Sequence, residues 1–142
     1  MNRYRLASIF VFSALLLSTT LLDGFGATGA AAQHGFSVKE YEQFHDVLHP
    51  LEHDALPKKD YRRIRSQANL LVKRGNAIVK LGVPSATSED KRDEFAKELN
   101  SFREALAKFK ADARRGTNDQ MKTSYSAVHD TFEMLAGMLP RR

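Results

Sequence analysis

Residues 93–116 read DEFAKELNSFREALAKFKADARRG, and the spacing of their apolar side chains decides the fold class. Steps of four and three residues alternate along the stretch, which gives one set of apolar positions: Phe95, Leu99, Phe102, Leu106, Phe109 and Ala113. Because an α-helix has about 3.6 residues per turn, this spacing puts the whole set on one face. Gly116 is typical of a helix end, and either Thr87 or Ser88 can cap the start. The stretch therefore predicts an amphipathic helix.

The segments on either side show the same periodicity. Thr117 and Gln120 form a capping box, which opens a helix with this apolar stripe: Met121, Tyr125, Val128, Phe132, Leu135 and Leu139. Upstream, a helix from about Asp60 to Leu81 has a stripe of its own: Tyr61, Ile64, Ala68, Leu71 and Ile78. Gly82 and Pro84 give its stop signal. These are the expected last and second helices of the domain.

The first helix contains a proline. Ser37 and Glu40 have the spacing of a capping box, and the stripe that follows is Tyr41, Phe44, Leu48, Leu51 and Ala55. Pro50 lacks a backbone donor, so we expect it to kink the helix or split it into two short pieces, and Pro57 to end it. Four amphipathic helices with short connections and no strand-like alternation predict an all-α, up-down-up-down four-helix bundle.

Residues 1–32 have the features of a signal peptide. Arg3 and Arg5 precede an apolar run over 6–22, and small residues at 30–32 predict cleavage before Gln33. The alternative is an uncleaved anchor, because the apolar run is near the lower limit for crossing a bilayer. We expect residues 33–142 to form one exported domain, periplasmic or secreted. Nothing after Gln33 is apolar enough to span a membrane, so no stable membrane association is expected once the leader is removed.

The amino-acid composition excludes several classes of function. The chain has no cysteine, which excludes disulfides, thiolate metal sites and covalently attached haem. Its formal net charge is +5, and removal of the leader lowers it by one. The basic residues of the second helix face the acids of the first, and no aromatic side chains are interleaved with them. We therefore expect no nucleic-acid partner.

Histidines are the residues most suited to chemistry here. His34 lies in the tail beside the expected cleavage point, and four others lie on helices: His45, His49, His53 and His129. A spacing of four places the first three on one face, one turn apart, the geometry with which one helix offers two imidazoles to one metal ion. At 100° per residue, the angle around the helix axis between the centre of the apolar stripe and the histidine grows from about 70° at His45 to about 150° at His53. The later histidines would then face solvent, unless Pro50 rotates the second half of the helix inward.

The last helix brings a fourth imidazole to the same height. If residue 37 is level with residue 139 in antiparallel neighbours, His129 lies opposite residue 47. We therefore predict a metal site between the first and last helices, with these ligands: His45, His49, His53 and His129. His53 would be the fourth ligand or a gate, and Glu52 and Asp130 would orient the imidazoles. Copper, zinc and nickel suit such ligands; structural, hydrogen-bonded histidines are the alternative.

No catalytic constellation accompanies the histidines. A di-iron carboxylate bundle needs glutamates from all four helices, and Glu42 with His45 supplies only one such motif. The helix over 61–81 contains no acid, and Ser126 stands where a second glutamate belongs. No serine lies on a sharp turn beside a base. We therefore do not expect an enzyme.

The chain resembles the four-helix cytochromes, cytochrome c′ and its b-type relatives. The likeness covers nearly all of 33–142 and includes a histidine on the last helix. Where cytochrome c′ has Cys-x-x-Cys-His, this chain has Tyr125, Ser126, Ala127, Val128 and His129. Both cysteines are replaced, so covalent haem is excluded.

The b-type relatives imply a different haem site. They hold non-covalent haem b with a methionine on the first helix and a histidine on the last. His129 fits the second role, and His45 or His49 would have to replace the methionine. The resemblance thus implies electron transfer as an alternative to metal buffering or carriage, and a ligand-free interaction module is a third. Which ion binds and whether the domain forms a homodimer stay open.

Overall fold

The structure, a computed structural model, describes residues 35–139, and these residues form helices and no strand. The elements are α1 (Lys39–Pro50), η1 (a π-helix, Leu51–Ala55), α2 (Tyr61–Leu81), η2 (a 3-10 helix, Glu89–Lys91), α3 (Arg92–Arg115) and α4 (Asn118–Gly137). The predicted all-α class is confirmed. The expected signal peptide over 1–32 and His34 lie outside the described residues.

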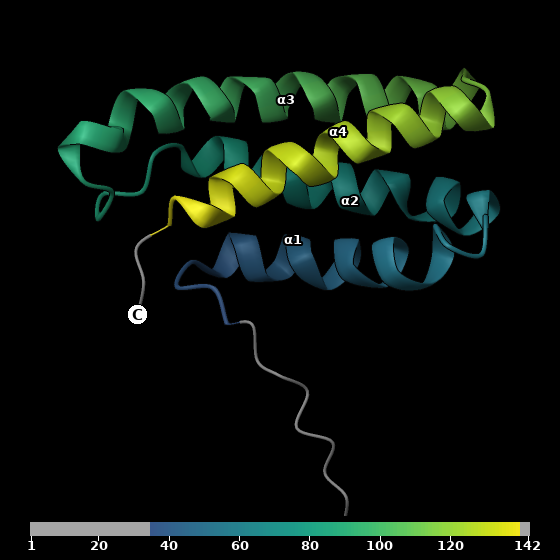
Figure 1. Cartoon of the computed structure of the whole chain (residues 1–142), viewed down its shortest axis with the longest axis horizontal. Helices are drawn as coiled ribbons and strands as arrows, with labels where there is room; N and C mark the ends of the chain where they lie inside the picture. The colour runs from purple at the N-terminus through teal and green to yellow at the C-terminus, as the bar shows by residue number, and fades with distance from the viewer. Residues whose placement is uncertain (1–34, 140–142) are drawn as a thin grey trace, which may run out of the picture. The chain divides into compact units, whose positions relative to one another are not determined.

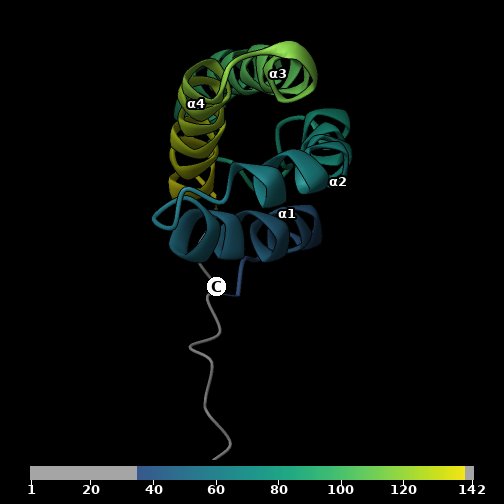
Figure 2. The ribbon, with the colours of Figure 1, turned by 90° about the vertical axis from the view of Figure 1, so that its right-hand side faces the viewer.

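Consecutive helices lie antiparallel (Figure 1). From α1 into η1 the contacts with α2 run in the opposite chain direction: Gln43 accepts from Arg74 over 2.8 Å, and Asp54 pairs with Arg63. The first and last helices are also antiparallel, because Tyr41 stacks on Phe132 and Leu48 accepts a hydrogen bond from Tyr125. Figure 2 shows the helices nearly end-on, in the order α1, α2, α3, α4 around one interior.

Phe132 of α4 is the aromatic centre of that interior. Its ring lies 4.6 Å from Phe44, 5.9 Å from Tyr41 and 6.4 Å from Phe102, measured between centroids. These long side chains join α1 to α4 across the bundle. Every apolar position predicted for the first and last helices is buried, whereas Tyr61 of α2 and Leu99 of α3 are half-buried.

Two residues of α2 let this helix pack closely against α3. A Cβ placed on Gly75 would lie 2.6 Å from both methyl carbons of Leu106, so the glycine permits this close approach. Nearer the other end, the Arg65 guanidinium donates to the carbonyls of Asp112, Ala113 and Gly116 over 3.1, 2.8 and 2.9 Å. Arg65 thereby adds donors at the C-terminal end of α3, where the Asp112 carbonyl also accepts from the Gly116 amide over 2.8 Å.

The predicted capping box at Ser37 and Glu40 is wrong. The N-cap position is Val38, and α1 begins at Lys39. The carboxylate that reaches back is that of Glu42, which accepts a hydrogen bond from the Phe36 amide over 2.8 Å. Glu42, and not Glu40, therefore holds the chain at the start of the helix.

The prediction that Thr87 or Ser88 caps the third helix is also wrong. Ser88 precedes the short η2 turn, where its side chain makes no capping bond to the described residues, and α3 begins only after Lys91. The Thr87 side chain is buried instead. The capping box that opens α4 is confirmed: the Thr117 amide donates to Gln120 over 2.8 Å, and the Gln120 amide donates back over 3.2 Å.

None of the helices within 35–139 combines the length and apolar character needed to cross a bilayer. Their buried faces pack against one another, and their outer faces are polar.

Candidate metal site

The histidine row spans the junction at which α1 changes into η1. Pro50 cannot donate to the carbonyl four residues back, and the chain continues from it as a π-helix. The Leu56 amide donates to the Leu51 carbonyl over 2.9 Å, and the Asp60 amide donates to the Ala55 carbonyl over 2.8 Å. The helical backbone continues through Pro50 without a gap, so the expected split into two short pieces is not seen, and the hydrogen-bonding pattern changes instead.

The π-turn changes where His53 points. An i→i+5 bond closes a wider turn than an α-helical bond, so each residue advances by less than 100° around the axis. The drift expected for a regular α-helix is thereby reduced, while Leu51 and Ala55 stay buried. The imidazole of His53 lies over that of His49, with ring centroids 4.4 Å apart. The π-turn thus keeps the row in line.

His45 forms the other end of the row but has different surroundings. Its ring centroid lies 5.2 Å from that of His49, 5.4 Å from Phe36 and 6.4 Å from Phe132. It is half-buried, whereas His49 and His53 are exposed. Burial, and next the neighbouring His49, lower the pKa of His45, against the opposing effect of nearby carboxylates led by Glu133. His45 is therefore held toward its neutral form between aromatic rings.

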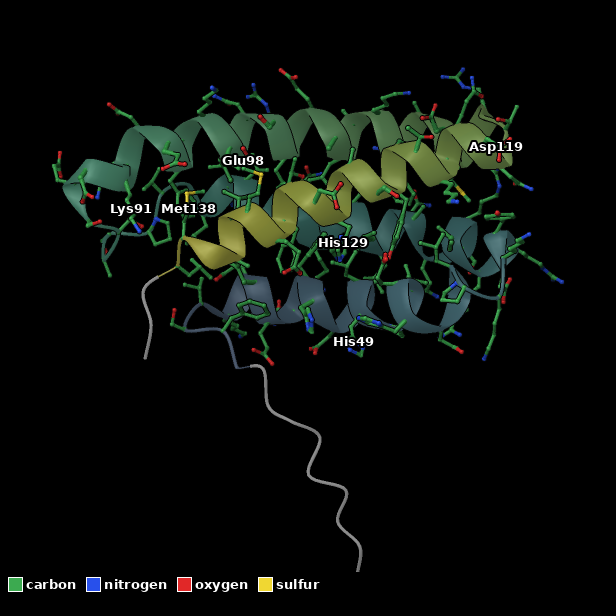
Figure 3. All side chains as sticks on the ribbon, viewed as in Figure 1. His49, Lys91, Glu98, Asp119, His129 and Met138 are labelled. Atoms are coloured by element: carbon green, nitrogen blue, oxygen red, sulfur yellow. The ribbon has the colours of Figure 1, made fainter. Side chains whose placement is uncertain are left out.

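His129 reaches the expected height but has its own partner. Figure 3 shows it on α4 at the same level along the bundle as His49 on α1. Its Nδ1 lies 3.2 Å from a carboxylate oxygen of Asp130, as expected for an orienting partner. The His129 side chain is 29% exposed, and that of Asp130 is 75% exposed. This contact is therefore open to solvent.

The four predicted ligands are not gathered around one point. Within 35–139, no three or more His, Asp or Glu side chains come close enough together to hold one ion. What the structure does bring together is the row of His45, His49 and His53, of which the last two form the closest pair. The chemistry available is therefore that of two exposed imidazoles one turn apart.

Glu52, predicted to orient an imidazole, is directed inward. One of its carboxylate oxygens is buried without a hydrogen-bond partner among the described residues. Burial, and next the Glu52 carboxylate, raise the pKa of Tyr125, whose hydroxyl donates to the Leu48 carbonyl over 3.3 Å. The sequence analysis did not predict that Glu52 lies near the buried Tyr125. The signal was the place of Glu52 directly after Leu51, at the border of the apolar stripe.

No family model matches the chain, and neither a curated protein nor a solved structure matches it. The likeness to bundle cytochromes therefore remains a prediction from the residues. Function is inferred from the geometry around His49 and His53.

Proposed function

We propose that this chain is an exported protein that binds a transition metal ion, copper, zinc or nickel, through the imidazoles of His49 and His53. Its role would be to buffer or carry the ion. The observation that carries the proposal is the 4.4 Å separation of the two exposed rings, kept in line by the π-turn after Pro50. Imidazole nitrogens are suitable ligands for all three ions.

The separation of the rings fits a shared ion. Two nitrogens bound to zinc at about 2.0–2.1 Å with a tetrahedral angle lie about 3.3 Å apart. Each ligating nitrogen lies between the ion and its ring centre, so the two ring centroids would be about 5 Å apart, close to both the 4.4 Å of His49 and His53 and the 5.2 Å of His45 and His49. His45, however, is half-buried and packed against Phe36, whereas His49 and His53 are exposed. His49 and His53 are therefore the better chelating pair.

The surroundings of the other candidates support the same choice. The interior between α1, α3 and α4 is filled by the rings of Phe44, Phe102 and Phe132, where a haem between the helices would need space. Within 35–139, no group of three or more ligating side chains that includes His129 gathers around one point. Both observations favour an ion on the outer face of the first helix over haem b or a site between helices.

Calorimetric titration of the purified protein with Zn(II) or Cu(II) at pH 7.5 tests the proposal. We expect binding in the micromolar range or tighter, and His49→Ala or His53→Ala should each weaken it by about tenfold or more, or about 1.4 kcal/mol. The double variant should be little worse than either single one, because two ligands of one site act together. Binding should weaken from pH 7 to pH 5, since protonated imidazole cannot ligate.

His129→Ala and His45→Ala are matched controls, since each removes one imidazole of the same chain outside the proposed pair. Both should leave the affinity within about twofold, less than 0.5 kcal/mol. Absence of micromolar binding to the unaltered protein would contradict the proposal. A large loss on His129→Ala would instead place the ion between α1 and α4.

A further inference from the structure

The pair of His49 and His53 fills only part of a metal's coordination sphere. Zinc in closed protein sites has four ligands, and one helix supplies two here. Within the part of the chain that the structure describes, no third His, Asp or Glu joins them. An ion bound by this pair thus has coordination positions that face outward, because both side chains are exposed.

We propose that a second copy of the chain fills those positions. The proposal rests on the metal-binding function above. Two copies related by a twofold axis bring His49 and His53 of each copy to one ion, which gives it four imidazoles. A twofold interface uses the same patch on both partners, so one exposed pair is sufficient to complete the site.

Charge on the same helix makes this pairing depend on the ion. The exposed carboxylate of Asp46 precedes His49 by three residues on α1, whereas Asp54, which follows His53, is paired with Lys58 and Arg63. Bringing two such faces together without an ion juxtaposes like charges, which is unfavourable. A divalent cation at the axis offsets that repulsion. The protein is therefore expected to be monomeric without metal.

A hollow lined by both polar and apolar residues lies on the side of the first helix that faces α2. It has a volume of about 300 Å³ and lies between α1, η1 and α2, with Val47, Pro50 and Leu70 among its lining residues. Leu70 is 39% exposed, which is unusual for a large apolar side chain of this protein. Consecutive residues of a helix point about 100° apart, so this hollow, which neither histidine lines, lies to one side of the proposed twofold axis.

Sedimentation velocity of the purified protein, with and without zinc chloride, tests the proposal. We expect a monomer in EDTA and a doubling of mass at one ion per two chains. Excess zinc should return the protein to monomer, because each pair then holds its own ion. His49→Ala and His53→Ala should stay monomeric at equimolar zinc, whereas His45→Ala should dimerise as the unaltered protein does. Far-UV circular dichroism should show that every variant is folded.

The outcomes separate this proposal from the one on which it rests. Zinc bound to a monomer at one ion per chain, with no change of mass at any ratio, overturns the dimer and leaves metal binding intact. No zinc binding overturns both. Dimerisation that persists in EDTA, or in His53→Ala, overturns the bridging role of the ion.

Discussion

Three histidines at equal spacing have unequal environments. His45 is half-buried against Phe36 and Phe132, whereas His49 and His53 face solvent. An imidazole packed between rings has less freedom to turn toward an ion, and an exposed one keeps that freedom. The row therefore divides into one residue that packs against the core and two that are available as ligands.

His45 should make the stability of the bundle depend on pH. Its pKa in the folded protein is lowered from 6.5, first by burial and then by His49, while Glu133, Asp46 and Glu42 oppose the change. The unfolded chain loses the burial and so binds the proton at higher pH. Stability is then fully present above about pH 6.5 and decreases as the pH falls through the lowered pKa.

Urea unfolding at a series of pH values measures this effect. We expect the free energy of unfolding to decrease from pH 7 to pH 5, and to decrease less steeply in His45→Gln, which cannot take up the proton. His53→Gln, an exposed member of the same row, is the matched control and should keep the slope of the unaltered protein. Equal slopes for the unaltered protein and His45→Gln would show that burial of His45 is not linked to folding.

Pro50 shows how far a single helix can be predicted from its sequence. A missing donor inside an apolar stripe is visible in the sequence, and an altered hydrogen-bonding pattern at Pro50 follows from it. The π-turn does not follow, because it depends on how Leu51 and Ala55 are buried against the rest of the bundle and on where the amides of Leu56 and Asp60 bond. The alignment of His53 with His49 therefore became visible only in the structure.

Pro50→Ala should keep both metal ligands and change only the turn between them. The restored amide can donate to the carbonyl four residues back, which favours a continuous α-helix. His53 would then lie relative to His49 as His49 lies relative to His45, whose ring centroids are 5.2 Å apart. A spacing of four on one helix still offers two imidazoles to one ion. We therefore expect the zinc affinity to stay within about threefold, which is about 0.7 kcal/mol.

Calorimetry gives the affinity of this variant, and far-UV circular dichroism shows whether its helix content is kept. Pro57→Ala is the matched control, since Pro57 lies beyond the end of η1, and it should bind zinc normally. A tenfold or larger loss of affinity in a well-folded Pro50→Ala would mean that the π-turn is needed to hold the pair in place.

At the scale of the whole molecule, the spacing of apolar residues predicted the buried core better than the spacing of histidines predicted a shared metal site. The stripe that includes Phe102 and Leu106 predicts burial directly, because position on a helix face decides which side chains leave water. The shared level of His129 and His49 followed from helix lengths in the same way. Whether two side chains at one level share an ion depends on rotamers and local partners, such as Asp130 beside His129. Spacing along the sequence does not contain that information.

A site on the outer face of one helix should also be independent of the core. Phe102 of α3 is buried against Phe44 and Phe132, on the interior side of the bundle. Phe102→Leu should lower the free energy of unfolding by about 1 to 3 kcal/mol, which a domain with a total of about 5 to 15 kcal/mol can tolerate. Zinc affinity, measured by calorimetry on the folded variant, should stay within about twofold, because His49 and His53 keep their place on α1 and η1. Arg103→Ala, at the exposed neighbouring position, is the control and should change neither quantity. If Phe102→Leu lowered stability and affinity together, the ion would have to lie between helices, since only a site built across the interior feels the loss of a ring on α3.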